Sequence, residues 1–472
     1  MKDYDEKNAL SIEKYSQQLI GHSFSEFCPI ENQSNKGNLG QIIERYFFHY
    51  ECNNDSRPDF PMAGVELKVT PFKELKNGKF SAKERLSLTK INYMEVVHEE
   101  CFEKSHLWEK CKLILLIYYK YIAGIRNIDN KIYYAKLFTP PQQDLLIIKN
   151  DYYFIVEKIR QGHAHELSES DTLYLGAAPK AAKNTDKTKQ PYSNIPAKPR
   201  GFSFKNSYMT YILNNYIVPG KQTYEKITKT PTTNFEQYVT NKINQYKGKS
   251  VYELCKEFGI EYKEQSLSTI EKKDGQSSQH KHGTGFPPKN LEAILAYRML
   301  GITSNCAEEF VKAGIVVKTI RIEKTNKIRQ NMSFPSFKFQ ELIDEHWDDS
   351  TFGNYLRETR FFFVVYKFDD NHILRLKGSQ FWNIPYNDLE EDVHQVWEKT
   401  KAVISNGLKI EVKNGRKCNN LPKQSENRVC HVRPHAKNSS DTYELPDGRH
   451  YPKQCFWLNN SYIYSQLNES LK

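Results

Sequence analysis

The sequence lacks a hydrophobic stretch long enough to cross a membrane. Its most apolar run, residues 113–119, is far shorter than the roughly 20 residues that a spanning helix needs. The N-terminal residues MKDYDEKNAL are charged and lack the apolar centre of a secretory signal peptide. The nine cysteines form no C-x-x-C pair, a distribution typical of free thiols in a reducing compartment. We therefore expect a cytoplasmic protein without a membrane partner.

Zinc-type ligand sets are also missing. Two H-x-H pairs are present, His163/His165 and His280/His282. No cysteine or histidine stands at ligand spacing from either pair, so the sequence does not predict a zinc site at these positions.

What the sequence does contain is an excess of positive charge. There are 68 Lys and Arg against 57 Asp and Glu, which gives a net charge of +11. This excess favours a polyanionic partner, because each basic side chain placed on a phosphate releases counterions, although a solvated basic surface has the same net charge. The 472 residues, 38% of them hydrophobic, exceed one ordinary core and predict two domains of similar size.

The chain repeats itself in order. Five segments of the N-terminal half return in the C-terminal half, four of them at nearly constant spacing. The pairs are GHSFSEFC and GKSVYELC, NLGQIIERYF and NLEAILAYRM, AGVELK and AGIVVK, AAPKAAKN and VRPHAKN, and FSFKNSYMTYIL and FWLNNSYIYSQL. A polar insertion at 272–285 explains the different spacing of the first pair. The pattern predicts a duplicated domain, 1–228 and 229–472, joined near residue 230 by a Pro/Thr/Lys-rich linker.

The segment RPDFPMAGVELKVT, residues 57–70, carries the most informative chemistry. Apolar residues alternate with Glu66 and Lys68, which predicts a half-buried strand with these two side chains on one face. Asp59 precedes the strand, where a turn can bring its carboxylate beside Glu66. These two carboxylates and the carbonyl of Leu67 form an oxygen-rich site suited to Mg²⁺. Such an ion activates an attacking water, and Lys68 can orient that water or stabilise charge on the scissile phosphate.

Two further residues are candidates for the same site. Residues 36–47 show the apolar stripe of a helix, with Glu44 at its border, where the helix can aim it at the metal. Lys110 precedes an apolar segment predicted to be a buried strand, and could reach the same phosphate. Taken singly, an E-x-K motif, a helix glutamate and a surface lysine are all common without a function.

The second copy differs from the first at these positions. The counterparts are Ala296 for Glu44, Val316 for Glu66, Glu309 for Asp59 and Lys318 for Lys68. Two of three carboxylates are lost although the scaffold residues around them are kept. This selective loss predicts that the second copy does not bind magnesium productively and is catalytically dead.

These motifs resemble the MutH/Sau-type endonuclease family, in particular its GATC-cutting restriction enzymes with two MutH-like domains in one polypeptide. The likeness rests on K-G-x-x-G-Q-I-I-E, D-x6-E-L-K, a downstream lysine and A-P-K-A-A…R-G-F, and it covers nearly the whole chain. It implies an α/β (α+β) protein with the PD-(D/E)xK nuclease fold, a mixed sheet flanked by helices, and Mg²⁺ as the cofactor. The site residues that it implies are Asp59, Glu66 and Lys68 as the catalytic triplet, Glu44 as the helix glutamate and Lys110 as the extra lysine. Glu109, just before Lys110, departs from the MutH pattern.

The resemblance also implies a DNA-reading segment. In the family, the loop matching Ala178-Pro179-Lys180 enters the major groove and contacts guanine, although MutH has an arginine in place of Ala178. Lys180 is suited to the O6/N7 edge of guanine. The residues predicted to lie in a loop and to contact phosphates are Lys183, Lys187, Lys189, Lys198, Arg200 and Lys205. The second copy keeps the segment as Arg433-Pro434-His435, so it is predicted to bind DNA without cutting it.

The favoured interpretation is a type II restriction endonuclease that cleaves double-stranded DNA at GATC and uses its C-terminal domain to bind a second site as an effector. One active site per chain implies either dimerisation on DNA or two successive nicks, and a GATC methyltransferase in the same system. A MutH-like, methyl-directed nicking endonuclease of mismatch repair is the first alternative, which the second copy disfavours. A non-catalytic DNA-binding regulator is the second, which the intact first-copy motif disfavours. The sequence leaves the blocking methylation, the oligomeric state and the number of metal ions open.

Overall fold

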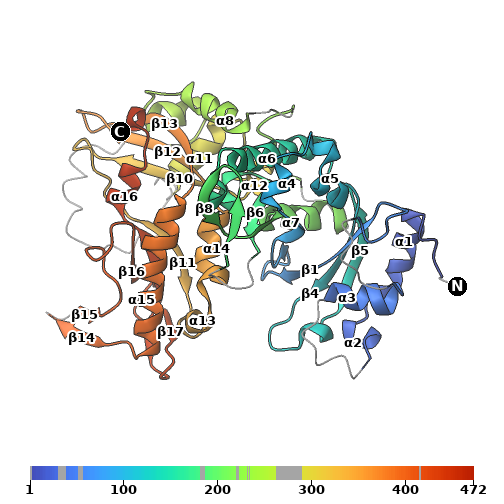
Figure 1. Cartoon of the computed structure of the whole chain (residues 1–472). Coiled ribbons are helices and arrows are strands. Elements are labelled where there is room, and N and C mark those ends of the chain that lie inside the picture. The colour runs from blue at the N-terminus through green and yellow to red at the C-terminus, as the bar shows by residue number, and fades with distance from the viewer. Residues whose placement is uncertain are drawn as a thin grey trace. The chain divides into compact units, whose positions relative to one another are not determined.

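The computed structural model describes residues 3–29, 39–50, 57–180, 186–218, 223–230, 232, 234–261, 290–413 and 416–472 (Figure 1). The chain divides into two compact units. Unit 1 comprises Met1–Tyr224 and Glu308–Gly314, and unit 2 comprises Glu225–Ala307 and Ile315–Lys472. The segment Glu308–Gly314 lies in unit 1, whereas the sequence assigned it to the second domain.

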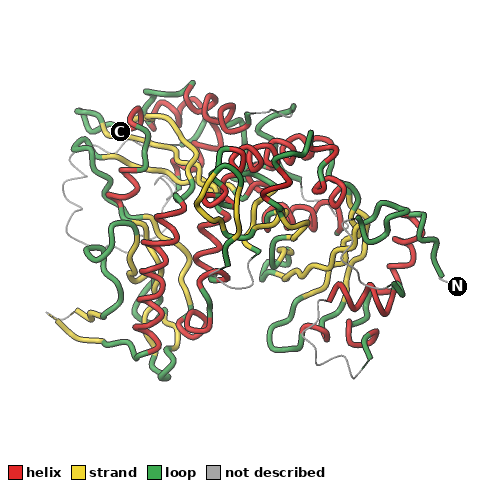
Figure 2. The backbone as a smooth tube through the Cα atoms, in the orientation of Figure 1, coloured by secondary structure: helices red, strands yellow, loops and turns green. Residues whose placement is uncertain are grey.

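Unit 1 mixes helices and strands (Figure 2). Its strands are β1 (Glu66–Glu74), β2 (Phe80–Ala82), β3 (Leu86–Lys90), β4 (Ile114–Lys120), β5 (Ile132–Phe138), β6 (Leu175–Pro179), β7 (Thr188–Gln190), β8 (Ser193–Ala197) and β9 (Arg200–Phe204). Its α-helices are α1 (Ala9–Ser16), α2 (Phe24–Phe27), α3 (Leu39–Ile42), α4 (Tyr93–Val96), α5 (His106–Cys111), α6 (Gln142–Arg160), α7 (Asn206–Ile212) and α12 (Glu308–Ala313). The π-helical turns η3 (Ile43–Phe47) and η8 (Leu213–Ile217) extend α3 and α7, and short 3-10 turns occur at η1 (Gln17–Leu19), η4 (Phe102–Lys104), η5 (Asn127–Asp129), η6 (Ala164–Glu166) and η7 (Glu169–Asp171).

The strands of unit 1 form two main sheets. The first has the order β2-β1-β4-β5, in which β1 and β4 are parallel and the outer pairs are antiparallel. The second is antiparallel, with the order β3-β9-β6, and β7 and β8 form a separate hairpin. All residues of β4 up to Tyr119 are buried, as expected for a strand with neighbours on both sides and an apolar sequence.

The core next to β1 is built from aromatic side chains of several elements. Residues of α1, α2, α3 and η3 pack with Leu67 of β1 and with buried residues of β4 and β5. The helical stripe predicted for 36–47 is thus confirmed over its described part, where Ile42, Ile43 and Phe47 are buried. This packing places the π-helical turn η3 beside the start of β1, the position of the candidate site.

Unit 2 is also mixed α/β. Its strands are β10 (Ile315–Ile322), β11 (Met332–Phe337), β12 (Arg360–Phe368), β13 (Leu374–Trp382), β14 (Ile410–Lys413), β15 (Arg416–Asn419), β16 (Cys430–Pro434), β17 (Thr442–Glu444), β18 (His450–Pro452) and β19 (Gln454–Leu458). Its helices are α8 (Phe235–Asn244), α9 (Val251–Glu257), α11 (Leu291–Met299), α13 (Phe339–Asp344), α14 (Thr351–Glu358), α15 (His394–Ser405) and α16 (Asn460–Ser465), with the shorter turns η9 (Trp347–Asp349), η10 (Asp388–Val393) and η11 (Glu469–Leu471).

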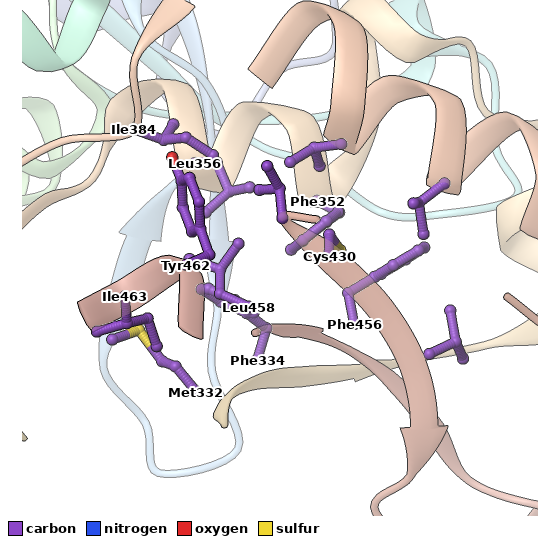
Figure 3. Close-up of a cluster of buried hydrophobic side chains, with 14 of the residues drawn as sticks. Met332, Phe334, Phe352, Leu356, Ile384, Cys430, Phe456, Leu458, Tyr462 and Ile463 are labelled. Atoms are coloured by element: carbon purple, nitrogen blue, oxygen red, sulfur yellow. The ribbon is translucent and has the colours of Figure 1, made fainter. Parts of the chain in front are cut away.

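The two main sheets of unit 2 have the orders β10-β12-β13 and β11-β19-β16. In the first of these sheets, β10 is parallel to β12 and β13 is antiparallel to β12. The strands β1, β4 and β5 of unit 1 have the same arrangement. Figure 3 shows part of the core, where side chains of β11, β19, α14 and α16 meet. The rings of Phe352 and Phe456 stack there with their centroids 4.3 Å apart.

Local features recur in the two units. Ser23 and Ser250 each begin a helix with a capping box, formed with Glu26 and Glu253. The glycines that precede them, in GHS and GKS, have φ of +90° and +89°, a left-handed conformation that favours glycine. A buried tyrosine hydroxyl also donates to a buried aspartate in each unit, Tyr208 to Asp144 at 3.1 Å and Tyr462 to Asp388 at 2.7 Å.

Within the part of the chain that the structure describes, no helix is both long and apolar enough to cross a lipid bilayer.

Candidate active site

A tight turn brings Asp59 beside β1. Phe60 pairs with Val65 in an isolated bridge, and Gly64 between them has φ of +66°. Because side chains other than glycine rarely adopt this conformation, the glycine permits the turn that the sequence predicted. Asp59 Oδ2 then accepts a hydrogen bond of 2.8 Å from the backbone N–H of Leu67.

Glu66 lies at the start of β1 and is buried, with 2% of its surface exposed. Two lysines neutralise it. Lys68 Nζ donates to Glu66 Oε1 at 2.6 Å, and Lys110 Nζ donates to Glu66 Oε2 at 3.0 Å. The structure therefore brings Lys110, which the sequence proposed separately, together with Glu66 and Lys68.

Lys110 is held more firmly than Lys68. It lies near the end of α5, is itself buried, and donates a second hydrogen bond of 2.6 Å to the carbonyl of Arg57. The Lys68 side chain is 22% exposed, against 11% for Lys110. Lys68 is thus the better placed of the two to reach a ligand in solvent.

Glu44 lies in the π-helical turn η3 and is half-buried. Its charge contributes to the field at Asp59. Burial is the largest cause that raises the pKa of Asp59 to about 6, the carboxylate of Glu66 raises it further, and Glu44 has a smaller effect in the same direction. The Leu67 N–H and the Lys68 ammonium oppose this rise. Three acids therefore share one electrostatic environment.

The donor set fits a hard divalent cation. Carboxylate oxygens of Asp59 and Glu66 and the carbonyl of Leu67 are the kind of ligand that Mg²⁺ prefers. The oxygens of Glu44, Asp59 and Glu66 do not all lie within 4.8 Å of one another; among the described residues, only His163, His165 and Glu166 place three potential ligand atoms that close. Both oxygens of Glu66 are instead engaged by ammonium groups.

The histidine group does not have the hydrogen bonding of a metal site. Gln190 accepts the Ala164 N–H through Oε1 and donates from Nε2 to the Ile195 carbonyl, which fixes the orientation of its amide. The same Nε2 faces His165 Nδ1 at 2.9 Å and donates to it. His165 Nδ1 is thus occupied as an acceptor, and Nε2 faces Glu166 at 3.4 Å. This hydrogen bonding assigns His165 to the packing of the β7–β8 hairpin rather than to an ion.

The predicted DNA-reading residues have different environments. Pro179 ends β6 and is half-buried, and Lys180 follows it at the surface. Burial of its amine lowers the pKa of Lys180, and the charges of Lys68 and Lys90 lower it further. Lys180 therefore lies in the same field as the candidate active site. Lys183 lies outside the described residues.

Two of the predicted phosphate contacts are wrong. The stretch predicted as a loop contains β7, β8 and β9. Arg200 is 4% exposed and donates from Nη1 to the Ala177 carbonyl at 2.7 Å, and Lys205 is 1% exposed and donates to the Thr172 carbonyl. Both side chains bind backbone carbonyls in the interior of unit 1, because Arg200 begins the central strand β9 and Lys205 directly follows that strand.

Sequence reasoning missed Lys90, at the end of β3, as a neighbour of Lys180. The alternation of Leu86 and Leu88 with polar residues predicts a strand there, but not which strand lies beside it.

Unit 2 has no acid in the place of Glu66. Val316 stands opposite Phe361 near the start of the parallel pair β10–β12, as Glu66 stands opposite Ile114 in β1–β4. Lys318 has no hydrogen bond or ion pair to any residue that the structure describes, and burial lowers its pKa. In the described part of unit 2, Lys318 is thus kept without a carboxylate in the place of Glu66.

The other two counterparts also differ in environment. Ala296 is fully buried in α11. Glu309 lies in α12, which belongs to unit 1, and its charge acts on Tyr174 of that unit.

The proposed DNA-binding residues of unit 2 lie at the surface. Arg433 and His435 are exposed at and after the end of β16. The Arg433 guanidinium lies over the Trp457 ring, 5.2 Å from its centroid, and the His435 ring meets the same indole edge-on at 5.7 Å. The indole holds both basic side chains at the surface.

Comparisons with known proteins identify the family of this chain. The family model described as "DNA mismatch repair enzyme MutH" matches residues 48–151, which include Asp59, Glu66, Lys68 and Lys110. Over its full length the chain is 36% identical to the type II restriction enzyme Sau3AI of Staphylococcus aureus, across 515 aligned residues that cover 100% of both chains. The chain therefore belongs to the MutH/Sau-type endonuclease family.

More distant relatives cover only part of the chain. The DNA mismatch repair protein MutH of Vibrio vulnificus is 26% identical over 211 residues, 42% of this chain and 89% of its own length. MutH of Vibrio cholerae serotype O1 is 26% identical over 214 residues, 43% of this chain and 93% of its own. These relatives are thus similar to about half of this chain, whereas Sau3AI matches all of it.

Proposed function

We propose that this protein is a type II restriction endonuclease that hydrolyses both strands of DNA at GATC in a Mg²⁺-dependent reaction. The observation that carries the proposal is the buried Glu66 carboxylate, which lies next to Asp59 and is bound by Lys68 and Lys110. The relative that shares the whole chain is a type II restriction enzyme. We place the enzyme in the cytoplasm, where a GATC methyltransferase of the same system protects the host DNA.

Asp59, Glu66 and the Leu67 carbonyl would hold the Mg²⁺, with Glu44 adding negative charge to the site. When bound, this ion polarises the scissile phosphate and lowers the pKa of a water. Lys68, the more exposed lysine, orients the attacking water and stabilises negative charge on the phosphate. Lys110, fixed by the Arg57 carbonyl, holds the Glu66 carboxylate in place through Oε2, which makes it a positioning residue.

We further propose that both units have the PD-(D/E)xK nuclease fold and arose by duplication, with domains 1–228 and 229–472. The shared strand orders, β1-β4-β5 with β10-β12-β13 and β3-β9-β6 with β11-β19-β16, support this. The segment Glu308–Gly314 is the exception, since it packs in unit 1. Val316 in the place of Glu66 supports a catalytically dead second domain.

The second domain is proposed to bind a second GATC site as an effector. The exposed Arg433 and His435, at the end of the strand that corresponds to β6, support DNA contact there. A single active site per chain requires two chains on one DNA site, or two successive nicks, for double-strand cleavage. A MutH-like nicking enzyme of mismatch repair is the second candidate, favoured by the family model at 48–151 but not by the full-length match. A non-catalytic regulator is disfavoured by the intact Glu66 site.

A plasmid digest tests the proposal. Supercoiled plasmids with one or two GATC sites, unmethylated or methylated at adenine or cytosine, are incubated with enzyme and Mg²⁺, and the ends are sequenced. We expect linear DNA cut at GATC only when Mg²⁺ is present, and faster cleavage of the two-site plasmid. Nicked circles alone would favour the MutH-like alternative, unchanged plasmid would favour the regulator, and equal rates on one and two sites would contradict the effector role.

A further inference from the structure

Gly201 lies at the centre of the sheet β3-β9-β6. It stands opposite Lys90 of β3 on one side and opposite Ala178 of β6 on the other. A Cβ atom at this position would lie 2.9 Å from the Thr89 carbonyl oxygen and 3.0 Å from Cδ of Lys180. Real Cβ atoms almost never approach backbone oxygen so closely. The stem of Lys180 therefore lies over Gly201, in the space that a side chain at this position would fill.

Unit 2 is built differently at the matching place. Cys455 of β19 stands opposite Ser336 and Arg433, as Gly201 stands opposite Lys90 and Ala178. Cys455 is fully buried, so the sheet accommodates a side chain here. His435 packs against Trp457, and its Nδ1 lies 3.5 Å from Ser336 Oγ. A hydrogen-bonded serine–histidine pair thus occupies the place where unit 1 has two lysines.

Among the residues that the structure describes, no carboxylate pairs with either of the two lysines of unit 1. No hydrogen bond or ion pair joins the amine of Lys90 or Lys180 to another residue in the described ranges, and both side chains are exposed. Of the two charges that act on Lys180, the ammonium of Lys68 has the larger effect and that of Lys90 the smaller, and both have the same sign as Lys180. Like charges held together repel, so an anion placed between them is stabilised more than at a single lysine. DNA offers a phosphate for every nucleotide.

We propose that Lys90 binds a DNA backbone phosphate beside the base read by Lys180, and that Gly201 is the positioning residue that lets the Lys180 stem lie next to it. The proposal rests on the proposed function in taking GATC-containing DNA as the ligand, and on the family resemblance in assigning a base contact to Lys180. Lys90 thereby contributes to the affinity for DNA, and Gly201 contributes to the discrimination between GATC and other sequences.

The salt dependence of DNA binding tests Lys90. Binding of the full chain to a GATC duplex is measured in Ca²⁺ at several salt concentrations for wild type, Lys90→Gln and Lys90→Arg. Each phosphate contact contributes about 0.9 to the slope of log K against log salt. We expect Lys90→Gln to lose about this much slope, and Lys90→Arg, which keeps the charge, to retain it. An unchanged slope in Lys90→Gln would overturn the assignment.

Gly201→Ala tests the positioning role, with Cys455→Ala as the matched change in unit 2. We expect Gly201→Ala to lower the ratio of GATC to non-specific binding by about tenfold, because Lys180 is displaced from the base edge. Non-specific binding should remain as in wild type, a result that a loss of folding would not give. Cys455→Ala should keep the wild-type ratio. A Gly201→Ala protein with wild-type discrimination would refute the role of Gly201.

The failure of this inference can be distinguished from the failure of the proposed nuclease function. A wild-type protein that binds GATC but does not cut it removes the nuclease proposal and leaves the Lys90 test valid. A wild-type protein that cuts GATC, together with an unchanged slope in Lys90→Gln, removes only the present inference.

Discussion

Replacing Lys68 by methionine is expected to lower the single-turnover rate of DNA cleavage by about 10²- to 10³-fold, the usual cost of losing one group that stabilises charge in a transition state. Methionine keeps most of the length of the side chain but removes the ammonium that binds Glu66 Oε1. Glu66 remains paired with Lys110, which is anchored on the Arg57 carbonyl, so the local fold should survive. Single-turnover kinetics at saturating enzyme separate this loss from a change in DNA affinity.

Lys318→Met is the matched control. Lys318 occupies the same place in the parallel pair β10–β12 as Lys68 in β1–β4, and it has no carboxylate partner in the described part of unit 2. We expect its single-turnover rate to equal that of wild type. If the two variants lost activity to the same extent, the assignment of catalysis to unit 1 alone would be wrong.

Replacing Lys312 by methionine is expected to destabilise unit 1 by about 3–5 kcal/mol, the range found when one partner of a buried ion pair is removed. Lys312 of α12 donates to Asp144 Oδ1 at 2.6 Å, and the two side chains are 3% and 2% exposed. Burial raises the pKa of Asp144, and the charge of Lys312 opposes that rise. Without the lysine, the aspartate is left buried with no cation. Chemical denaturation, followed by circular dichroism and by tryptophan fluorescence, measures the loss in the free energy of unfolding.

Two further variants serve as controls for the effect of Lys312→Met on stability. Lys312→Met combined with Asp144→Asn removes the ammonium and the more deeply buried of its two carboxylate partners and should recover part of the stability. Glu308, the other partner at 2.9 Å, keeps its charge in this variant. Lys104→Met removes an exposed lysine paired with Glu100 at the surface and should change stability little. A Lys312→Met protein as stable as wild type would show that α12 is not part of the folded unit 1.

The sequence predicted the local arrangement around Glu66 well, because the information for it lies in neighbouring residues. The alternation around Glu66 and Lys68 specified one strand face, and the glycine at position 64 allowed the turn that returns Asp59. Lys110 was identified only as a residue ahead of an apolar strand. That it would reach Glu66 depends on the parallel pairing of β1 with β4, which the local pattern does not contain.

The predictions that failed concern side chains whose environment is set by distant parts of the chain. Arg200 and Lys205 occur among lysines and prolines that suggest a loop, yet the β3-β9-β6 sheet buries both. Residues 313–318 repeat residues 63–68, which places Lys312 at the position of Met62, and Met62 is 65% exposed. Nothing in the repeat indicates that Lys312 pairs with Asp144 of unit 1, because that contact has no counterpart at Met62.

The most direct test of the central claim is the single-turnover rate of Glu66→Gln on a GATC duplex with Mg²⁺, measured beside its DNA affinity in Ca²⁺. Glutamine keeps the shape of the side chain but removes the charge that Lys68 and Lys110 bind and that a divalent ion requires. Cleavage should fall by at least about 10³-fold, with DNA still bound. Cleavage within a fewfold of the wild-type rate would contradict the account.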